Sequence, residues 1–182
     1  GTAVQIVSSG PDLTHSAIKN GYLKLISKAR HSVYIQTPYF VPDDSIMEAL
    51  KIASLSGVDV RLMLPARPDH FYVYWASLSY VGELLEAGVR CYMYQRGFLH
   101  SKTIVCDSFA CTIGTANLDI RSFDLNFEIN AFVYDQEIGQ QLTEQFLRDI
   151  NDCMEITPEV YFSRPLGVRF KEGLFRLMSP IL

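Results

Sequence analysis

The first half of the chain alternates between short apolar runs and longer segments whose apolar positions recur three and four residues apart. The short runs have the length of strands and lie at 3–7, 32–36, 58–64 and 89–94. The longer segments have helical periodicity and are predicted to end near residues 30, 56 and 87. Regular alternation with short connections predicts an α/β fold, a three-layer αβα sandwich around a mixed, largely parallel sheet.

Two of these helices have clear start signals and a clear apolar face. Asp12 or Thr14 can cap the first helix, and Asp43 with Asp44 opens the second. The positions predicted to be buried on these two helices are Ile18, Tyr22, Leu25, Ile26, Ile46, Leu50, Ala53 and Leu55.

The third helical segment, 71–87, holds more aromatic side chains than one buried face needs. The residues that fit such a face are Phe71, Tyr74, Trp75 and Leu78. Tyr72 and Tyr80 do not fit it, so we treat them as candidates for contact with a substrate or a lipid. Tyr39 and Phe40, on a proline-bounded loop after a strand, are further candidates for lining a site.

After residue 94 the pattern changes, because strand-like segments follow one another with no helix between them. These segments lie at 99–106, 110–114 and 126–134, and a last helix is predicted over about 136–153. Residues 157–182 form a partly helical C-terminal tail. We expect a single domain over 1–182, with its chemistry in the irregular second half.

Composition and charge narrow the class of protein. A chain of 182 residues, 48% hydrophobic and 20% charged, can bury the core of one domain. Its net charge of −4 argues against a nucleic-acid partner, because domains that bind along the phosphates are usually basic. Its four cysteines include no C-x-x-C pair, and no ligand set has the spacing of a metal site. We therefore expect neither a metal nor another cofactor.

Two polar residues interrupt the strand-like segment 99–106. Residues two apart in a strand point to the same face, so His100 and Lys102 are predicted to lie side by side. An imidazole can attack or donate a proton near neutral pH, and a fixed positive charge can bind a phosphoryl oxygen. Asp107 lies an odd number of residues from His100, so we expect it to face away and fix a turn at the strand end.

Two later segments add polar groups to this pair. Gly114 allows a tight turn, Thr115 follows it, and Asn117 can offer its amide to a phosphoryl oxygen. Glu128 needs a partner within its apolar strand, and the expected one is the imidazole of His100, whose tautomer such a bond would fix. Taken singly, each residue is more often a solvated or ion-paired side chain. The combination is far more specific.

That combination resembles the signature of the phospholipase D superfamily, His-x-Lys-x4-Asp followed by Gly-(Ser/Thr)-x-Asn and a downstream Glu. The matching residues are His100, Lys102, Asp107, Gly114, Thr115, Asn117 and Glu128. The threonine stands where serine is commoner. The resemblance implies a phospholipase D-like domain.

Segments 37–43, 114–123 and 163–182 narrow the resemblance to the C-terminal half of bacterial cardiolipin synthases. Members of that family join two phosphatidylglycerol molecules, release glycerol, and carry two copies of the signature after N-terminal membrane segments. This sequence has one copy. The resemblance therefore implies a soluble piece of a longer protein at the bacterial cell membrane.

Displacement at phosphorus is in line, so one imidazole cannot both attack and protonate the leaving oxygen. We expect a second histidine from another copy, either in the second phospholipase D-like half of the parent chain or in a homodimer mate. The resemblance implies a phosphohistidine intermediate and an acid/base role for His100, with Lys102 and Asn117 on the phosphoryl oxygens. The residues alone do not distinguish acid from nucleophile. The expected partners are an anionic phospholipid, such as phosphatidylglycerol, and the membrane surface.

Other interpretations remain open on the sequence. One alternative is a homodimeric phosphodiesterase or nuclease, which the acidic net charge and the lipid-synthase-like tail disfavour. Another is a non-catalytic module for dimerisation or membrane docking, which the intact signature disfavours. The tail segment 168–178 mixes Arg169, Lys171 and Arg176 with apolar residues. It either packs on its own domain or on the missing half, with Leu174 as a test position, or lies on anionic lipid. Packing is the favoured interpretation, and the two roles are compatible.

Overall fold

An eight-stranded sheet runs through the molecule in the order β1-β9-β7-β6-β2-β4-β5-β10. Its strands are β1 (Ala3–Ser9), β2 (Ser32–Gln36), β4 (Asp59–Pro65), β5 (Arg90–Tyr94), β6 (Thr103–Cys106), β7 (Ala110–Gly114), β9 (Glu128–Tyr134) and β10 (Cys153–Ile156). A separate parallel pair joins β3 (Phe40–Val41) to β8 (Leu118–Asp119). The structure is a computed structural model, and it describes residues 1–67 and 69–178.

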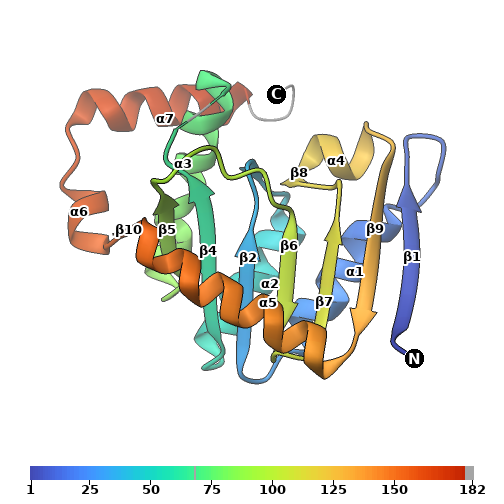
Figure 1. Cartoon of the computed structure of the whole chain (residues 1–182). Coiled ribbons are helices and arrows are strands. Elements are labelled where there is room, and N and C mark those ends of the chain that lie inside the picture. The colour runs from blue at the N-terminus through green and yellow to red at the C-terminus, as the bar shows by residue number, and fades with distance from the viewer. Residues whose placement is uncertain (68, 179–182) are drawn as a thin grey trace.

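Helices cover both faces of the sheet and confirm the predicted αβα layers. Figure 1 shows α5 (Gln136–Asp149) in front of the sheet and α1 (Ala17–Lys28) and α2 (Asp44–Leu55) behind it. The back layer is extended by α3 (Phe71–Glu86), which packs on β5. The shorter helices are α4 (Ile120–Asp124), a 3-10 turn (Ile150–Asp152), α6 (Pro158–Phe162) and, at the C-terminal end, α7 (Leu166–Met178).

Within the large sheet, parallel pairing among the described residues is confined to β2, β4 and β5. Among the described residues, the other five neighbouring pairs of the large sheet are antiparallel. The sheet is mixed as predicted, but the expectation that it is largely parallel is wrong, because most neighbouring strands pair antiparallel. The reason lies after residue 94, where short turns replace crossover helices. The last helix was expected to reach about 153, but it ends at Asp149, and β10 returns antiparallel to β5.

The back of the sheet carries the larger core. The predicted core residues of α1 are all buried, as are Ile46, Leu50 and Ala53 of α2. Leu55 is instead 71% exposed. It lies nine residues after Ile46, which places it about 180° away around the helix.

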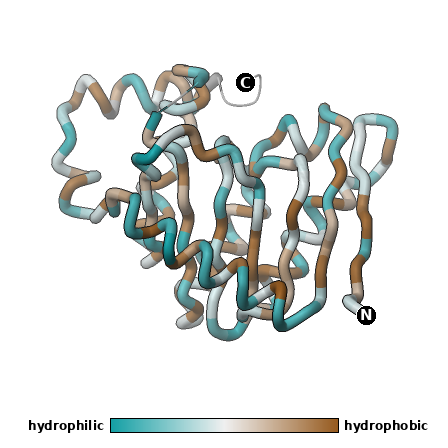
Figure 2. Tube along the Cα trace, in the orientation of Figure 1, coloured by the Kyte–Doolittle hydropathy of each residue, from teal (hydrophilic) through white to brown (hydrophobic). Residues whose placement is uncertain are grey.

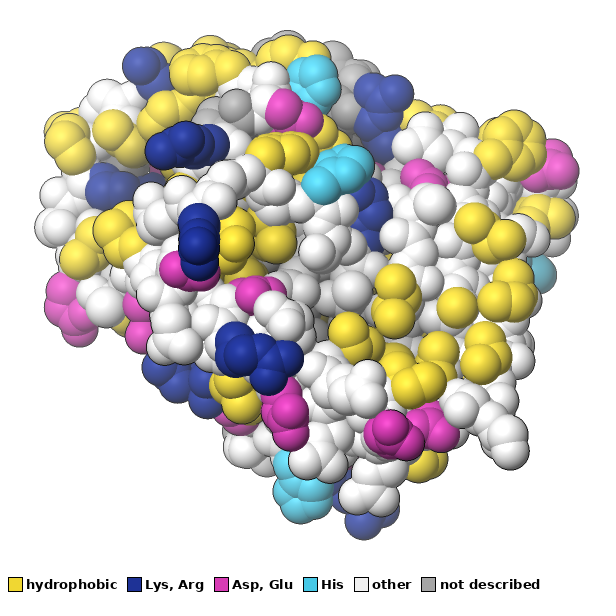
Figure 3. All heavy atoms as spheres, viewed as in Figure 1, with side chains coloured by type: hydrophobic (Ala, Val, Ile, Leu, Met, Phe, Trp, Pro, Cys, Tyr) yellow, Lys and Arg dark blue, Asp and Glu magenta, His cyan; other side chains and the backbone are white. Residues whose placement is uncertain are grey.

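The front face of the sheet is only partly covered. Phe146 of α5 stacks on Tyr34 with ring centroids 4.9 Å apart, and Figure 2 shows α5 as largely hydrophilic against the more hydrophobic strands. Beyond α5, the front of β1, β9 and β7 lies open, and Figure 3 shows hydrophobic side chains gathered there. The exposed residues, which the strand register places on this one face, are Val4, Ile6, Ile113 and Ile129. We call these four residues the front patch.

The C-terminal tail packs against α3. Tyr161 of α6 is buried, and its hydroxyl donates to the carbonyl oxygen of Leu78 over 2.7 Å. The helix α7 packs against α3 and crosses its upper end in the view of Figure 1. Within the described part of the chain, no helix is both long enough and apolar enough to span a bilayer.

Candidate active site

The polar segments singled out in the sequence meet at one edge of the sheet, the upper edge in Figure 1. Gln36, the last residue of β2, pairs with Thr103, the first residue of β6. Gly114 ends β7 beside the start of β9, and its N–H donates to the carbonyl oxygen of Lys102 over 3.3 Å. The loop before β6, the turn after β7 and the start of β9 therefore lie side by side.

The turn at 114–117 is held against β9 by several bonds. A Cβ atom at Gly114 would lie 2.3 Å from Oδ1 of Asn130 and 2.4 Å from the carbonyl oxygen of Ile129, so a side chain has no room. Thr115 donates its N–H to the Ile129 carbonyl over 3.0 Å, and its Oγ1 accepts from the Ile129 N–H over 2.9 Å. Asn130 also accepts from the N–H of Ala116 over 3.2 Å. These positions agree with the turn-fixing role expected of Gly114 and Thr115.

Asn117 ends this turn and is buried. Its backbone N–H donates to Oγ of Ser122 over 3.1 Å, and its side-chain amide donates to the Asp119 carboxylate. Its Oδ1 atom is buried and has no partner among the described residues. Asp119 caps α4 by accepting from the N–H of Ser122 over 2.7 Å. Burial raises the pKa of Asp119, although its hydrogen bonds from Ser122 and Asn117 oppose that change.

Lys102 is a half-buried cation at the centre of this edge. Its Nζ donates to the carbonyl oxygen of His100 over 3.0 Å. Burial lowers the pKa of Lys102, and the negative charges of Glu128, Asp119 and Asp69 work in the opposite direction. Lys102 is thus a partly desolvated cation that forms no ion pair with a carboxylate among the described residues, so it can bind an anionic group.

His100 lies in the loop before β6 and not in a strand, so the predicted strand-face pairing with Lys102 is wrong. The physical reason is at β2, which ends at Gln36 just before Pro38, so residues ahead of Thr103 have no strand to pair with. The imidazole is exposed and stacks on the ring of Phe98 with centroids 5.6 Å apart. None of the described residues makes a hydrogen bond to its ring nitrogens.

Glu128 begins β9 but does not bond to His100. Its carboxylate accepts from Nδ2 of Asn126 over 3.3 Å. In the described part of the chain no hydrogen bond joins Glu128 to the imidazole, so that prediction is wrong. Phe127 and Ile129, the apolar neighbours of Glu128, are also exposed, because α5 does not cover this end of the strand.

A cavity of about 330 Å³ opens at the same edge. It is lined by Asn117 and Asp119 and by two predicted contact residues, Tyr39 and Tyr72. The hydroxyl of Tyr39 donates to Asp69, and burial together with that carboxylate raises the pKa of Tyr39. The remaining lining residues are Val41, His70, Val73, Ile120, Arg121 and Asn126.

The four predicted catalytic residues share this edge but do not share one cleft. Asn117 lines the cavity, whereas His100, Lys102 and Glu128 do not. Lys102 and Glu128 lie within electrostatic reach of each other, and His100 extends to the surface. The arrangement therefore leaves the imidazole accessible at the surface.

Two predicted contact residues belong to the core instead. Phe40 and Tyr80 are both buried, and their rings meet edge to face with centroids 6.4 Å apart. The short strand β3 docks on α3, where the N–H of Phe40 donates to Oγ of Ser77 over 3.1 Å. That docking covers both rings, so the prediction that they contact a substrate is wrong.

Asp107 lies at the opposite end of β6, as the sequence led us to expect. It accepts from the backbone N–H groups of Arg30, His31 and Ser32 at 2.8, 2.7 and 2.9 Å. Partial burial works against ionisation, but these three bonds hold the pKa of Asp107 below its ordinary value. With φ at +54° it turns the chain from β6 into β7, which agrees with a structural role.

Sequence reasoning missed three residues that shape the site. They are Asp119, Ser122 and Asn130. The Asp-x-x-Ser spacing at 119–122 is a helix-capping signal that could have revealed the first two. Asn130 lies two residues after Glu128 in the same strand, so the sequence could have predicted that both side chains point to the same face of the sheet.

The donors gathered here suit an anion. A lysine ammonium and an asparagine amide can both bind phosphoryl oxygens. Among the described residues, no group of three or more His, Cys, Asp and Glu side chains has the geometry to hold a metal ion.

Solved structures share this fold. Phosphatidylserine synthase from Haemophilus influenzae superposes with a TM-score of 0.74 at 15% identity, covering 99% of this chain and 46% of that one. Nuc, a phospholipase D family member from Salmonella typhimurium, superposes with a TM-score of 0.72 at 19% identity, covering 86% of this chain and 99% of Nuc. Fold and signature together define a phospholipase D-like domain.

The sequence comparisons are more specific. Residues 22–150 match the family described as cardiolipin synthase, PLD-like domain, and the chain belongs to that family. It is 53% identical over 181 residues to a cardiolipin synthase of Listeria monocytogenes (strain HCC23), covering 100% of this chain and 38% of that protein. It is 55% identical over 179 residues to the major cardiolipin synthase ClsA of Bacillus subtilis, covering 98% and 37%. The chain thus spans less than two fifths of the relatives it matches.

Proposed function

We propose that this chain supplies one half of the active site of a cardiolipin synthase. The complete enzyme would transfer a phosphatidyl group from one phosphatidylglycerol to another and release glycerol. The relatives named cardiolipin synthase support the reaction, and the share of their length that this chain spans supports an incomplete site.

The single observation that carries the proposal is the placement of His100 and Lys102. The exposed imidazole has no hydrogen-bond partner among the described residues, while the ammonium group of Lys102 is half-buried and bonded to the carbonyl oxygen of His100. In-line displacement at phosphorus needs one group on each side of the reacting atom. An exposed imidazole without a partner is suited to act on one side of the phosphorus atom, which leaves the other side to a second group.

In the proposed reaction a histidine of the second half attacks phosphorus and forms a P–N bond. The P–O bond to glycerol breaks, and His100 donates its proton to the departing oxygen. His100 then takes the proton from a hydroxyl of the second phosphatidylglycerol, which attacks phosphorus and breaks the P–N bond. Lys102 and Asn117 hold the non-bridging oxygens throughout.

We infer that the second half docks on the front patch. The patch is a flat sheet surface of branched apolar side chains, from Val4 and Ile6 to Ile113 and Ile129, which α5 leaves open. A monomer rarely leaves such a contiguous apolar surface uncovered. The patch reaches the end of β9 that carries Glu128, so a partner bound there would lie next to the site.

Substitution of His100 in the complete enzyme tests the proposal. Both His100→Ala and His100→Asn should abolish product formation, since asparagine keeps the size of the side chain but cannot move protons. His31→Ala, at an exposed histidine beside Asp107 at the opposite edge of the sheet, is the matched control. Product formation near the level of the control by either His100 variant would exclude the proposed role.

A further inference from the structure

The helix α7 packs on α3 through a side that includes Phe175 and Arg176, and it leaves other apolar side chains exposed to solvent. Its exposed apolar residues are Leu166, Phe170, Leu174 and Leu177, which we call the α7 stripe. At 100° per residue these positions fall within an arc of about 80°. The favoured interpretation that this helix packs on the domain is thus confirmed, but Leu174 is 48% exposed and is not the side chain that carries the packing. The side chains of Arg169 and Met178, which belong to the same predicted segment, lie outside the described part of the structure.

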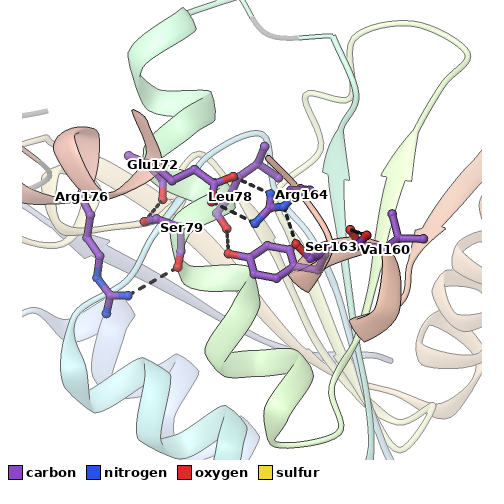
Figure 4. A network of polar contacts seen from close by, with 9 residues as sticks. Leu78, Ser79, Val160, Ser163, Arg164, Glu172 and Arg176 are labelled. Carbon is purple, nitrogen blue, oxygen red and sulfur yellow. Dashed lines mark hydrogen bonds and ion pairs between the residues drawn. The ribbon is translucent and has the colours of Figure 1, made fainter. Parts of the chain in front are cut away.

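Charged side chains hold α7 in this orientation. Arg164 donates two hydrogen bonds to the buried carboxylate of Glu172, one of them over 2.9 Å. Arg176 pairs with Glu83 and donates to the carbonyl oxygen of Ser79 over 3.4 Å. Figure 4 shows Arg164 facing Glu172 and Arg176 reaching toward Ser79 of α3. Of the three basic residues that the sequence offered for lipid contact, Arg176 is thus used to hold α7 on α3.

The side of α7 that faces α3 links this helix to the mouth of the candidate active site. Phe175 of α7 packs edge to face on Phe71, with ring centroids 6.0 Å apart. Phe71 and its neighbour Tyr72 are both exposed at the start of α3. Tyr72 also lines the cavity that contains Asn117. Figure 3 shows hydrophobic side chains over this upper part of the molecule, with Lys and Arg side chains among them.

The charge at the border of the stripe is positive. Lys171 is exposed, with its Nζ 5.9 Å from the centroid of the Trp75 ring. The acidic residue of α7, Glu172, is buried and paired with Arg164. A helix with an apolar face bordered by an exposed lysine has the character of an interfacial helix on anionic lipid.

We propose that the α7 stripe lies in the surface of an anionic lipid bilayer and turns the mouth of the active site toward the lipid. The inference rests on the proposed function, since a phospholipid substrate keeps its acyl chains in the bilayer while its headgroup enters the site. A narrow, convex stripe on an outer helix suits insertion between lipids. The front patch offers a separate and flatter surface for a protein partner.

Vesicle binding tests the proposal directly. The chain is mixed with vesicles of phosphatidylglycerol and phosphatidylcholine, or of phosphatidylcholine alone, and the bound fraction is measured by sedimentation. The test variant is Phe170→Ser with Leu177→Ser, at positions 74% and 82% exposed. The matched control is Ile52→Ser with Leu55→Ser, which removes two residues of α2 that are 60% and 71% exposed.

We expect the stripe variant to bind phosphatidylglycerol vesicles at least about tenfold more weakly, with an unchanged melting temperature, and the control to bind like the unaltered chain. Lys171→Glu should weaken binding about fivefold or more, and only to anionic vesicles. Equal binding by the stripe variant, or no binding by the unaltered chain, overturns the proposal. Unchanged vesicle binding with a changed oligomeric state would assign the stripe to a protein partner instead.

The experiments distinguish a failure of the proposed function from a failure of this inference. His100→Ala should leave vesicle binding unchanged, because the imidazole is not part of the stripe. If His100→Ala retained turnover, the chemistry would be wrong while the lipid-binding surface could still hold.

Discussion

The carboxylate of Glu128 is bonded to the side chain of Asn126, two residues earlier, and not to His100. Its effect within the site falls on Lys102, whose pKa burial lowers and the Glu128 charge raises. The Glu128 charge also raises the pKa of Asp119, and at Lys102 it favours the charged ammonium form. It does not orient the imidazole.

Glu128→Gln should narrow the pH range of the complete enzyme on its alkaline side. Without that negative charge, burial lowers the pKa of Lys102 further, so the ammonium form is lost at a lower pH. The measurement is the pH profile of turnover, with Glu144→Gln on the exposed side of α5 as the control. A shift of the acidic limb alone would mean that Glu128 acts on a histidine after all.

Gly114→Ala should destabilise the fold by about 2 kcal/mol or more, because the new methyl group meets a backbone carbonyl and cannot be accommodated by a rotamer change. Gly173→Ala in α7 is the matched control. A Cβ there has nothing within 4 Å, so the change should stabilise the helix by up to about 1 kcal/mol. Urea unfolding of both variants decides, and equal stability of the two would contradict the packing described at the turn.

Much of this architecture was readable from the sequence. The strands at 32–36 and 110–114 fall where the pattern placed them, and all four predicted core residues of α1 are buried. The spacing of apolar residues shows which face of an element is buried, so these elements can be predicted without knowing which elements they pack against.

The prediction failed where tertiary contacts decide. His100 was assigned to a strand because its segment is apolar, but a strand also needs a neighbour, and β2 ends before it can pair. Phe40 and Tyr80 were taken as surface residues because nothing in the sequence shows that β3 docks on α3. The orientation of α7 depends on Glu172 meeting Arg164, which periodicity alone does not reveal.

Asp107→Ala should lower the free energy of unfolding by about 2 kcal/mol, because three backbone N–H groups lose their acceptor. Asp107→Asn should cost less, since an amide oxygen can still accept and asparagine tolerates the positive φ. The folded-state pKa of Asp107 is lowered, so its contribution is present above the unfolded pKa of about 4 and is lost as pH falls through the folded value.

Unfolding measured at neutral and acidic pH checks this sign. The unaltered chain should lose part of its advantage over Asp107→Asn below about pH 4. A constant difference between the two at every pH would show that the carboxylate charge at this turn is unimportant.

Glu172→Gln should release α7 from α3. The change leaves Arg164 partly buried without its counter-charge, and breaking a buried ion pair in this way costs about 3–5 kcal/mol. Leu174→Asp, at an exposed position of the same helix, should cost less than about 1 kcal/mol. Melting temperature and the rate of proteolysis within 163–178 distinguish the two. A larger loss from Leu174→Asp would mean that α7 packs through its apolar side.

The central claim is that this chain holds only half of the chemistry. Its most direct test is the turnover of phosphatidylglycerol by the chain under conditions where sedimentation shows a monomer. The account predicts no cardiolipin above background from the monomer, and product when a second signature-bearing half is supplied. Full activity from a demonstrated monomer, abolished by His100→Ala, would show that one imidazole suffices and would contradict the account.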